Sequence, residues 1–375
     1  MALQIPLTMK AVQVVDFNQP YVLADVDVPT NLASGDLLVK VAVASYCHTD
    51  GMVQAGVFGT TLPCTASHEG SGTVVSVGRN VRAFQPGDRV MIGLPTHPCG
   101  ICADCLGPET QRQYCRHVRG HIGIHLDGCF AQYVRLDSRF TTRLPESVSF
   151  LDAAPLACAG RTAWRAVQLA ALRPGQWLAI VGAGGGLGHL AVQFARKQGL
   201  RVVGIDVRDE ALELVCEMGA DAVLDARLGI EAVVKAVRRT VGVDGDHADD
   251  DDDDDDADGV DATITLSDAP TAAALGCAVT RMHGTMVQVA QPQDVCIPFR
   301  ELVFRDVRVR GSLLSSAGES DAMVGFIAEH GLSVRTSLFH GLDKIHELVE
   351  LVHGGKMQGK PVIIVDQEQV ENDSS

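Results

Sequence analysis

The stretch that most restricts the possible folds is WLAIVGAGGGLGHLAVQFARKQGLRVVGID, residues 177–206. An apolar run leads into a glycine turn, a helical pattern follows with Leu190 and Phe194 on one face, and a second apolar run ends at Asp206. This order predicts a βαβ unit whose helix N-terminus faces a pyrophosphate. The predicted fold class is therefore α/β, with a doubly wound parallel sheet of the Rossmann type.

The same stretch predicts a dinucleotide site, because glycines let the backbone approach phosphate groups closely. Asp206 would bond the adenosine ribose hydroxyls, and its charge would repel a 2′-phosphate, which favours NAD(H) over NADP(H). Arg208 keeps NADP(H) open, since an arginine there accommodates that phosphate; stacking on adenine and plain solvent exposure are its alternatives. The predicted cofactor-binding residues of the turn are Gly182, Gly184, Gly185, Gly186, Leu187 and Gly188.

Length and composition indicate a soluble protein of about two domains. The 375 residues are 46% hydrophobic and 21% charged. Every apolar run is interrupted well before the roughly 18 residues that a membrane-spanning helix needs. The N-terminal stretch has neither a basic region nor a small-residue cleavage signature, so we expect a cytoplasmic protein with no membrane partner.

The formal net charge of −16 is partly local, because Asp249–Asp256 is a run of eight aspartates. Such a block repels itself and cannot be buried, which predicts a disordered surface insertion at 244–258. Calcium binding and a partner-binding tail are the alternatives. The total charge would argue against nucleic acid as a partner, but without this run the chain is only mildly acidic, which says little about partners. We expect no nucleic-acid partner.

Four cysteines lie close together in CGICADCLGPETQRQYC, residues 99–115. In a chain without a secretion signal, metal ligation is favoured over disulfides, and four thiolates close a tetrahedral shell with no open position. The spacing therefore predicts a structural zinc lobe at 95–117; an iron–sulfur cluster fits the spacing poorly, and a chance cysteine loop is the remaining alternative. The predicted ligands are Cys99, Cys102, Cys105 and Cys115.

A second set of metal-binding residue types is scattered over three short motifs. CHTDGM begins at Cys47, SHEGSG contains His68 beside Glu69, and LACAGRTAW contains Cys158. A Cys–His–Cys set with a free fourth position is the ligand set of an open, catalytic zinc. Each residue alone is weak evidence, and a lone buried cysteine such as Cys158 is also consistent with a small core residue.

Taken in order, these motifs resemble the zinc-dependent medium-chain alcohol dehydrogenase family, especially its yeast and fungal ethanol dehydrogenase branch. The resemblance runs from about residue 10 to 366 and includes PGDRV and the closing GGKMQGKPVIIVD. It implies two zinc ions per chain, the catalytic one on Cys47, His68 and Cys158 and the structural one on the four-cysteine lobe. Nine residues precede Cys115 where the family usually has seven, which a loop can absorb.

The resemblance also implies roles for polar residues around the catalytic zinc. Asp50 would orient His68, and Glu69 would lie behind the metal, unless it simply caps a turn. His48 would lie beside the cofactor phosphates. Lys360 falls where the family has an arginine that reaches the pyrophosphate, a surface lysine being the alternative.

In the family a hydroxyl next to the substrate oxygen begins a proton relay, and Thr49 matches that position. The relay usually continues to a histidine three residues on, where this chain has Met52. A thioether cannot carry a proton, so water or another group takes over here, or proton release is slower.

By the same resemblance the fold combines a GroES-like, mostly β catalytic domain with the Rossmann domain. The predicted catalytic domain is split into 1–157 and 299–375, and the NAD-binding domain at 158–298 is inserted within it. The active site would lie in the cleft between the domains. The family implies a homodimer or homotetramer.

Pocket residues depart from the ethanol enzymes. Phe58 and Leu94 stand where the yeast enzymes have two tryptophans, which predicts a substrate larger than ethanol, such as an aromatic or secondary-metabolite alcohol or aldehyde. Arg161 replaces an apolar residue and either approaches an anionic or oxygen-rich substrate or forms a buried ion pair. The predicted activity is zinc-dependent hydride transfer between NAD(H) and this substrate; the alternatives are a redox-neutral conversion, suggested by Met52, and a non-catalytic nucleotide-binding member.

Overall fold

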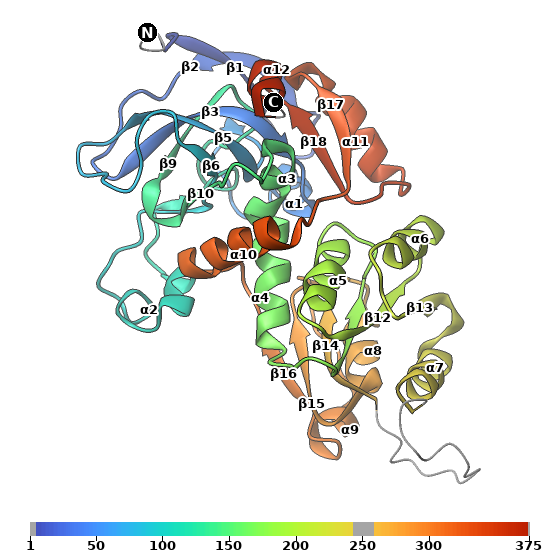
Figure 1. Ribbon diagram of the computed structural model, residues 1–375. Helices are drawn as coiled ribbons and strands as arrows, with labels where there is room; N and C mark the ends of the chain where they lie inside the picture. Colours follow the sequence, from blue (N-terminus) through green and yellow to red (C-terminus); the bar gives the residue numbers. More distant parts are fainter. Residues whose placement is uncertain (1–4, 243–258, 374–375) are drawn as a thin grey trace. The chain divides into compact units, whose positions relative to one another are not determined.

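The computed structural model of the chain describes residues 5–242 and 259–373. The chain forms two compact units, whose helices and strands are labelled in Figure 1. Unit 1 comprises Met1–Arg161 and Leu314–Ser375, and unit 2 comprises Thr162–Leu313. Unit 2 is therefore inserted in the sequence of unit 1. The predicted aspartate-rich insertion at 244–258 lies outside the described residues.

The core of unit 2 is a parallel sheet with the strand order β13-β12-β11-β14-β15-β16. Every residue of β11 is buried, as expected for a central strand that is covered on both faces. Strand order reverses on either side of β11, which is the Rossmann arrangement, so the predicted α/β fold class is confirmed. The strands are β11 (Trp177–Val181), β12 (Arg201–Asp206), β13 (Ala222–Asp225), β14 (Val260–Thr265), β15 (Thr280–Gln288) and β16 (Arg308–Gly311).

Helices alternate with these strands along the chain (Figure 1). The turn between β11 and α5 is packed so closely that glycine is required: a Cβ at Gly184 would lie 2.3 Å from the Ala211 carbonyl oxygen, and one at Gly188 would lie 2.2 Å from that of Gly182. The helices are α4 (Arg161–Leu169), α5 (Gly188–Lys197), α6 (Asp209–Glu217), η4 (Ala226–Leu228), α7 (Ile230–Gly242), α8 (Ala272–Val279) and α9 (Phe299–Val303).

Unit 2 continues past residue 298, where the sequence predicted a return to the first domain. The added piece is β16, which pairs in parallel with β15 through contacts such as Met286 opposite Val309. The sequence pattern does not reveal this strand, because all four residues of β16 are exposed and two are arginines. The boundary therefore falls at Leu314.

Unit 1 is mostly β, in agreement with the predicted GroES-like character. Its sheets have the orders β2-β1-β4, β10-β6-β5-β3-β18-β17 with β9 also on β3, and β7-β8. The strands are β1 (Thr8–Val14), β2 (Val22–Asp27), β3 (Asp36–Ser45), β4 (Cys64–Thr65), β5 (Glu69–Val77), β6 (Arg89–Met91), β7 (Pro95–Thr96), β8 (Gly120–His121), β9 (Tyr133–Asp137), β10 (Thr142–Arg143), β17 (Thr336–His340) and β18 (Lys360–Ile364).

The C-terminal segment completes the sheet that the N-terminal segment begins. Strand β18 lies between β3 and β17, antiparallel to β3 with Val362 opposite Ser45. All residues of β18 are buried, including Lys360. The same sheet continues from β3 to β5, where Ser45 is opposite Glu69. Three strands from distant parts of the chain thus bring Lys360, the end of β3 and Glu69 side by side.

Helices of unit 1 are short, apart from α10. Among residues 5–242 and 259–373, no helix combines the length and apolar character needed to cross a membrane. The helices are α1 (His48–Gln54), α2 (Ala103–Leu106), η1 (Glu109–Tyr114), η2 (Ser138–Phe140), α3 (Phe150–Pro155), the π-helical turn η3 (Leu156–Gly160), α10 (Ala317–His330), η5 (Leu342–Lys344), α11 (Ile345–His353) and α12 (Gln367–Asp373).

The packing of the glycine turn makes a testable prediction about stability. Gly184→Ala should lower the free energy of unfolding by about 1–3 kcal/mol, because the new methyl group overlaps the backbone at Ala211. Gly185→Ala is the matched control, since its Cβ would meet nothing closer than 3.4 Å. Urea unfolding of both variants measures the difference, and equal stabilities would contradict the packing.

Candidate metal centres and cofactor turn

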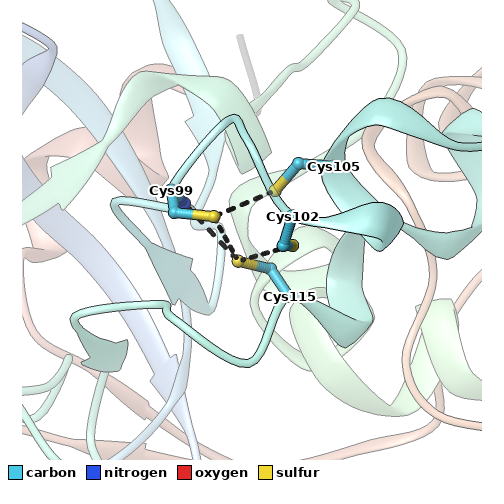
Figure 2. A group of neighbouring side chains, drawn as sticks. All are labelled: Cys99, Cys102, Cys105 and Cys115. Atoms are coloured by element: carbon cyan, nitrogen blue, oxygen red, sulfur yellow. Dashed lines mark hydrogen bonds between the residues drawn. The ribbon is translucent and has the colours of Figure 1, made fainter.

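The four cysteines of the predicted zinc lobe point toward a common centre, as Figure 2 shows. The Sγ atoms of Cys99 and Cys102 each lie 3.7 Å from Cys115 Sγ, and Cys99 Sγ lies 4.0 Å from Cys105 Sγ. None forms a disulfide. Zinc–sulfur bonds of roughly 2.3 Å in a tetrahedral site place the sulfurs about 3.8 Å apart, so this cluster fits a zinc ion.

Local backbone structure produces the convergence. Gly100 has a positive φ of 76°, which turns the chain between Cys99 and Cys102. The longer segment before Cys115 contains the 3₁₀ helix η1, Glu109–Tyr114. Hydrogen bonding, first from the Ile101 backbone, lowers the pKa of the Cys99 thiol to about 6, which favours the thiolate form that a metal needs. Burial instead raises the pKa of Cys105 to about 12.

The second predicted ligand set also assembles, entirely within unit 1. Ligand atoms of Cys47, His68, Glu69 and Cys158 all lie within 4.8 Å of one another. Cys47 caps the N-terminus of α1, His68 precedes β5, and Cys158 lies on the π-helical turn η3. A hydrogen bond with Cys158 is the main cause that holds the pKa of Cys47 well below its usual range. Paired thiols beside a buried imidazole have the chemistry of a zinc site.

Asp50 supports this cluster from behind. One of its oxygens lies 3.2 Å from His68 Nδ1, and the other accepts the backbone N–H of Cys47 at 2.7 Å. His68 is fully buried, and its other nitrogen, Nε2, has no hydrogen-bond partner among the described residues. Burial lowers the pKa of His68, but Asp50 and Cys47 together outweigh burial and raise the pKa overall. An unsatisfied buried nitrogen next to two thiols fits a metal ligand, with Asp50 orienting the ring.

Glu69 lies beside the same cluster and is held by a buried cation. Lys360 Nζ lies 2.6 Å from Glu69 Oε2 and donates to the Tyr46 carbonyl at 2.8 Å. The other Glu69 oxygen accepts the Ala159 N–H at 3.1 Å, so Glu69 also caps the turn that carries Cys158. Burial, opposed by Lys360, raises the pKa of Glu69 to about 7.

These contacts correct one expectation about Lys360. The surface alternative is wrong, because the side chain is only 3% exposed. Its ammonium group is occupied by Glu69 and Tyr46, so the predicted reach to a pyrophosphate would require it to exchange partners.

The remaining predicted residues near the cluster lie on α1 or in the surrounding β structure. His48 is exposed, and Thr49 and Met52 are half-buried on the same short helix. Phe58 packs against the main core of unit 1, and Leu94 is buried, with its carbonyl accepting the Ile122 N–H at 3.0 Å. Their roles toward the relay and the substrate stay predictions.

Arg161 is the predicted pocket residue whose surroundings are most clearly defined. It is 1% exposed, and its Nη2 donates to the Phe140 carbonyl at 2.8 Å and approaches Thr142 Oγ1 at 3.4 Å. Burial lowers the pKa of Arg161 to about 10. The role of Arg161 toward a substrate stays a prediction.

In unit 2, Asp206 organises the predicted cofactor turn. Its Oδ2 accepts the Gly184 N–H at 3.0 Å, and its Oδ1 accepts the Val207 N–H at 2.8 Å. Arg208 Nε lies 4.0 Å from the same carboxylate. Gly182 has a positive φ of 84°, which shapes the turn before α5. The carboxylate at the end of β12 therefore lies next to the glycines, as the βαβ pattern predicts.

Sequence reasoning missed a turn that packs over the His68 segment. A Cβ at Gly123 would lie 2.3 Å from the Ser67 carbonyl oxygen, and one at Gly128 would lie 2.1 Å from it. Ser67 itself has a positive φ of 70°. Gly123 and Gly128, two of the three glycines in GHIGIHLDG, are the available signal, since a glycine often marks close backbone approach.

Comparisons with known proteins agree with both halves of the chain. Residues 33–146 match the family described as alcohol dehydrogenase GroES-like domain, and residues 186–329 match the family described as zinc-binding dehydrogenase. An alcohol dehydrogenase of Geobacillus stearothermophilus is 31% identical over 362 residues, which cover 96% of this chain and 100% of that protein.

Two solved structures share the fold over nearly the whole chain. The alcohol dehydrogenase of the archaeon Aeropyrum pernix has a TM-score of 0.82 and 30% identity, covering 95% of this chain and 99% of that one. A cinnamyl alcohol dehydrogenase of Sorghum bicolor has a TM-score of 0.82 and 27% identity, covering 95% and 97%.

The Glu69–Lys360 pair makes a testable prediction. Lys360→Met should lower the free energy of unfolding by about 3–5 kcal/mol, because it leaves the Glu69 carboxylate buried without its cation. Lys344→Met is the control: it removes the exposed Lys344–Glu347 pair and should cost less than about 1 kcal/mol. Urea unfolding at fixed zinc concentration compares the two, and similar losses would refute the buried pair's importance.

Proposed function

The chain belongs to the zinc-dependent medium-chain alcohol dehydrogenase family, and on that premise we propose that it transfers a hydride between NAD(H) and an alcohol or carbonyl substrate. The observation that carries the proposal is the intact cluster of Cys47, His68 and Cys158. Three protein ligands leave one position of a tetrahedral zinc ion for substrate. When bound there, zinc supplies a Lewis acid that polarises the substrate oxygen.

Residues of this chain would prepare the site for that chemistry. Asp50 orients His68 so that Nε2 faces the two thiols, and Lys360 neutralises Glu69 behind them. Thr49, on the helix that Cys47 caps, would take the proton of the substrate hydroxyl into a hydrogen-bonded chain. Met52 cannot extend this chain, so solvent would have to receive the proton at an earlier point.

The proposed cofactor is NAD(H). Asp206 is 8% exposed and is held by the Gly184 N–H, which keeps its negative charge at the end of β12. A fixed carboxylate at this position suits ribose hydroxyls and disfavours a 2′-phosphate. The nearby Arg208, 4.0 Å from the carboxylate, would have to leave Asp206 to serve NADP(H).

A substrate larger than ethanol remains the proposed class. Neither Phe58 nor Leu94 has the bulk of tryptophan, so the pocket that they are proposed to line would be wider. The similarity to a protein named cinnamyl alcohol dehydrogenase supports an aromatic alcohol or aldehyde. Placement in the yeast and fungal ethanol dehydrogenase branch and a cytoplasmic location remain predictions.

A complete ligand set argues against a non-catalytic member, because each of the three catalytic-zinc positions keeps a residue that binds zinc. The redox-neutral alternative rests on Met52. Deuterium-labelled NADH separates it from reduction, since net reduction leaves the label in the product.

We further propose a homodimer formed through β16. This strand is the edge of the unit 2 sheet, and all its residues are exposed, so its backbone groups can pair with another strand. Exposed apolar side chains lie on β16 itself and in residues 282–304 before it, and a second copy would cover them symmetrically. They are Met282, Val295, Phe299, Leu302, Val303, Phe304 and Val309, each at least 40% exposed.

The activity prediction uses the zinc-loaded protein with NAD(H) and a panel running from ethanol to aromatic alcohols and aldehydes. We expect a higher kcat/KM for the aromatic members.

Cys158→Ser should lose one zinc ion and lower the rate at least about a thousandfold, whereas Cys115→Ser should lose the other zinc ion and mainly lower thermal stability. Absorbance of the nicotinamide and metal content per chain are the measurements; no turnover across the panel would refute the proposal.

The dimer prediction is tested with Val309→Glu combined with Phe304→Glu. Charged groups on the edge should halve the mass measured by light scattering on a sizing column, because they cannot be desolvated against a second copy. Leu228→Glu is the control, an apolar residue that is 70% exposed elsewhere in unit 2. A wild-type chain that is already monomeric, or a double variant with unchanged mass, would contradict the interface.

A further inference from the structure

The short helix α1 carries Thr49 and begins at Cys47, so its position determines where two residues of the proposed site lie. A helix of seven residues is too short to be stable on its own in water. Gly51, in the middle of α1, weakens it further, because glycine is one of the poorest helix formers. Contacts from other parts of unit 1 must therefore hold α1 in place.

Residues 17–21, which lie between β1 and β2, hold α1 at several points. The Tyr21 hydroxyl donates to the Asp50 carbonyl at 3.1 Å, and both side chains are buried. At the end of the helix, the Asn18 N–H donates to the Gln54 carbonyl at 2.8 Å, and the Gln54 side chain donates back to the same segment at 2.7 Å. Of these three hydrogen bonds, the one from Tyr21 is nearest to Cys47 along α1.

Asp50 connects this hydrogen bond to the predicted metal ligands. Its Oδ1 lies 3.2 Å from His68 Nδ1, and its Oδ2 accepts the Cys47 N–H at 2.7 Å. All three acceptor atoms of Asp50 are therefore engaged, with Tyr21 on the backbone carbonyl. A shift of that carbonyl would move the carboxylate as well, and so would disturb both predicted ligands together.

A second tyrosine fixes the ring that makes this contact. Tyr21 and Tyr46 are each 3% exposed, and their rings meet edge to face, with centroids 6.5 Å apart and planes at 89°. The Tyr46 hydroxyl also lies close to α1, because a Cβ at Gly51 would be only 3.2 Å from its oxygen. Glycine at position 51 thus leaves room for the tyrosine pair at the expense of helix propensity.

We propose that Tyr21 is a positioning residue for the catalytic centre: its hydroxyl holds the Asp50 carbonyl and so keeps the Asp50 carboxylate directed at His68 and at the start of α1. This inference rests on the proposed function. Groups that orient a metal ligand from behind typically change metal affinity by about 10–100-fold. Tyr21 acts one contact further away, so we expect a smaller effect of about three- to tenfold.

The test measures cobalt binding at the catalytic site by the thiolate-to-cobalt absorbance, in full-length protein that keeps zinc in the four-cysteine lobe. Tyr21→Phe removes only the hydroxyl and keeps the ring that packs on Tyr46, and the cobalt affinity should fall about three- to tenfold. Gln54→Ala is the matched control. It removes a hydrogen bond between the same two segments, to the Gln19 carbonyl, and should leave the cobalt affinity unchanged.

Three results would decide against the proposal. Wild-type cobalt affinity in Tyr21→Phe, even with a lower melting temperature, would make the hydroxyl purely structural and would leave the proposed function intact. A loss in Gln54→Ala as large as in Tyr21→Phe would show that any loosening of α1 has this effect. A wild-type chain that binds no cobalt at Cys47, His68 and Cys158 would refute the proposed function itself.

Discussion

Charge balance at the Cys47–His68–Cys158 cluster, in which Cys47 and His68 are buried and Cys158 is half-buried, is the constraint on which the rest of unit 1 depends. Two thiols, an imidazole and the Glu69 carboxylate meet within 4.8 Å, and an interior tolerates such groups only when each charge is compensated. Asp50 Oδ1 lies 3.2 Å from His68 Nδ1, and Lys360 Nζ lies 2.6 Å from Glu69 Oε2, so the imidazole and the carboxylate each have a partner of opposite charge. A bound divalent metal would compensate the charge of the thiolates. Without it, the burial of these groups lowers the stability of the fold.

Sheet register is what makes this balance possible. Ser45 of β3 lies opposite Glu69 of β5 on one side and opposite Val362 of β18 on the other. Cys47 follows the end of β3 by two residues, so the metal ligand, its neighbouring acid and the compensating lysine meet at one end of three adjacent strands. Unit 2 is inserted in the sequence between the pieces that supply them. Its own sheet is parallel, and there Asp206 at the end of β12 accepts the Gly184 N–H of the turn that follows β11.

Much of this could be predicted from the sequence, because the signals are local. The βαβ pattern around residues 177–206, the four-cysteine spacing and the residue types of the second ligand set all correspond to what the structure assembles. The return to unit 1 was placed too early, because β16 is an exposed edge strand whose stability comes from hydrogen bonds to β15 instead of from a buried apolar face. The partners of Lys360 left no local trace, since Glu69 lies in β5 and Tyr46 directly follows β3.

The sequence by itself determined which residues could bind metal and cofactor, and that a glycine turn joins a strand to a helix. Only the tertiary structure decided which charge faces which. Lys360 meets Glu69 because β18 enters the sheet beside β3, and the Arg161 guanidinium meets the Phe140 carbonyl, 21 positions earlier in the chain. Ion pairs depend on strand register and on burial, and neither is specified until distant segments pack together.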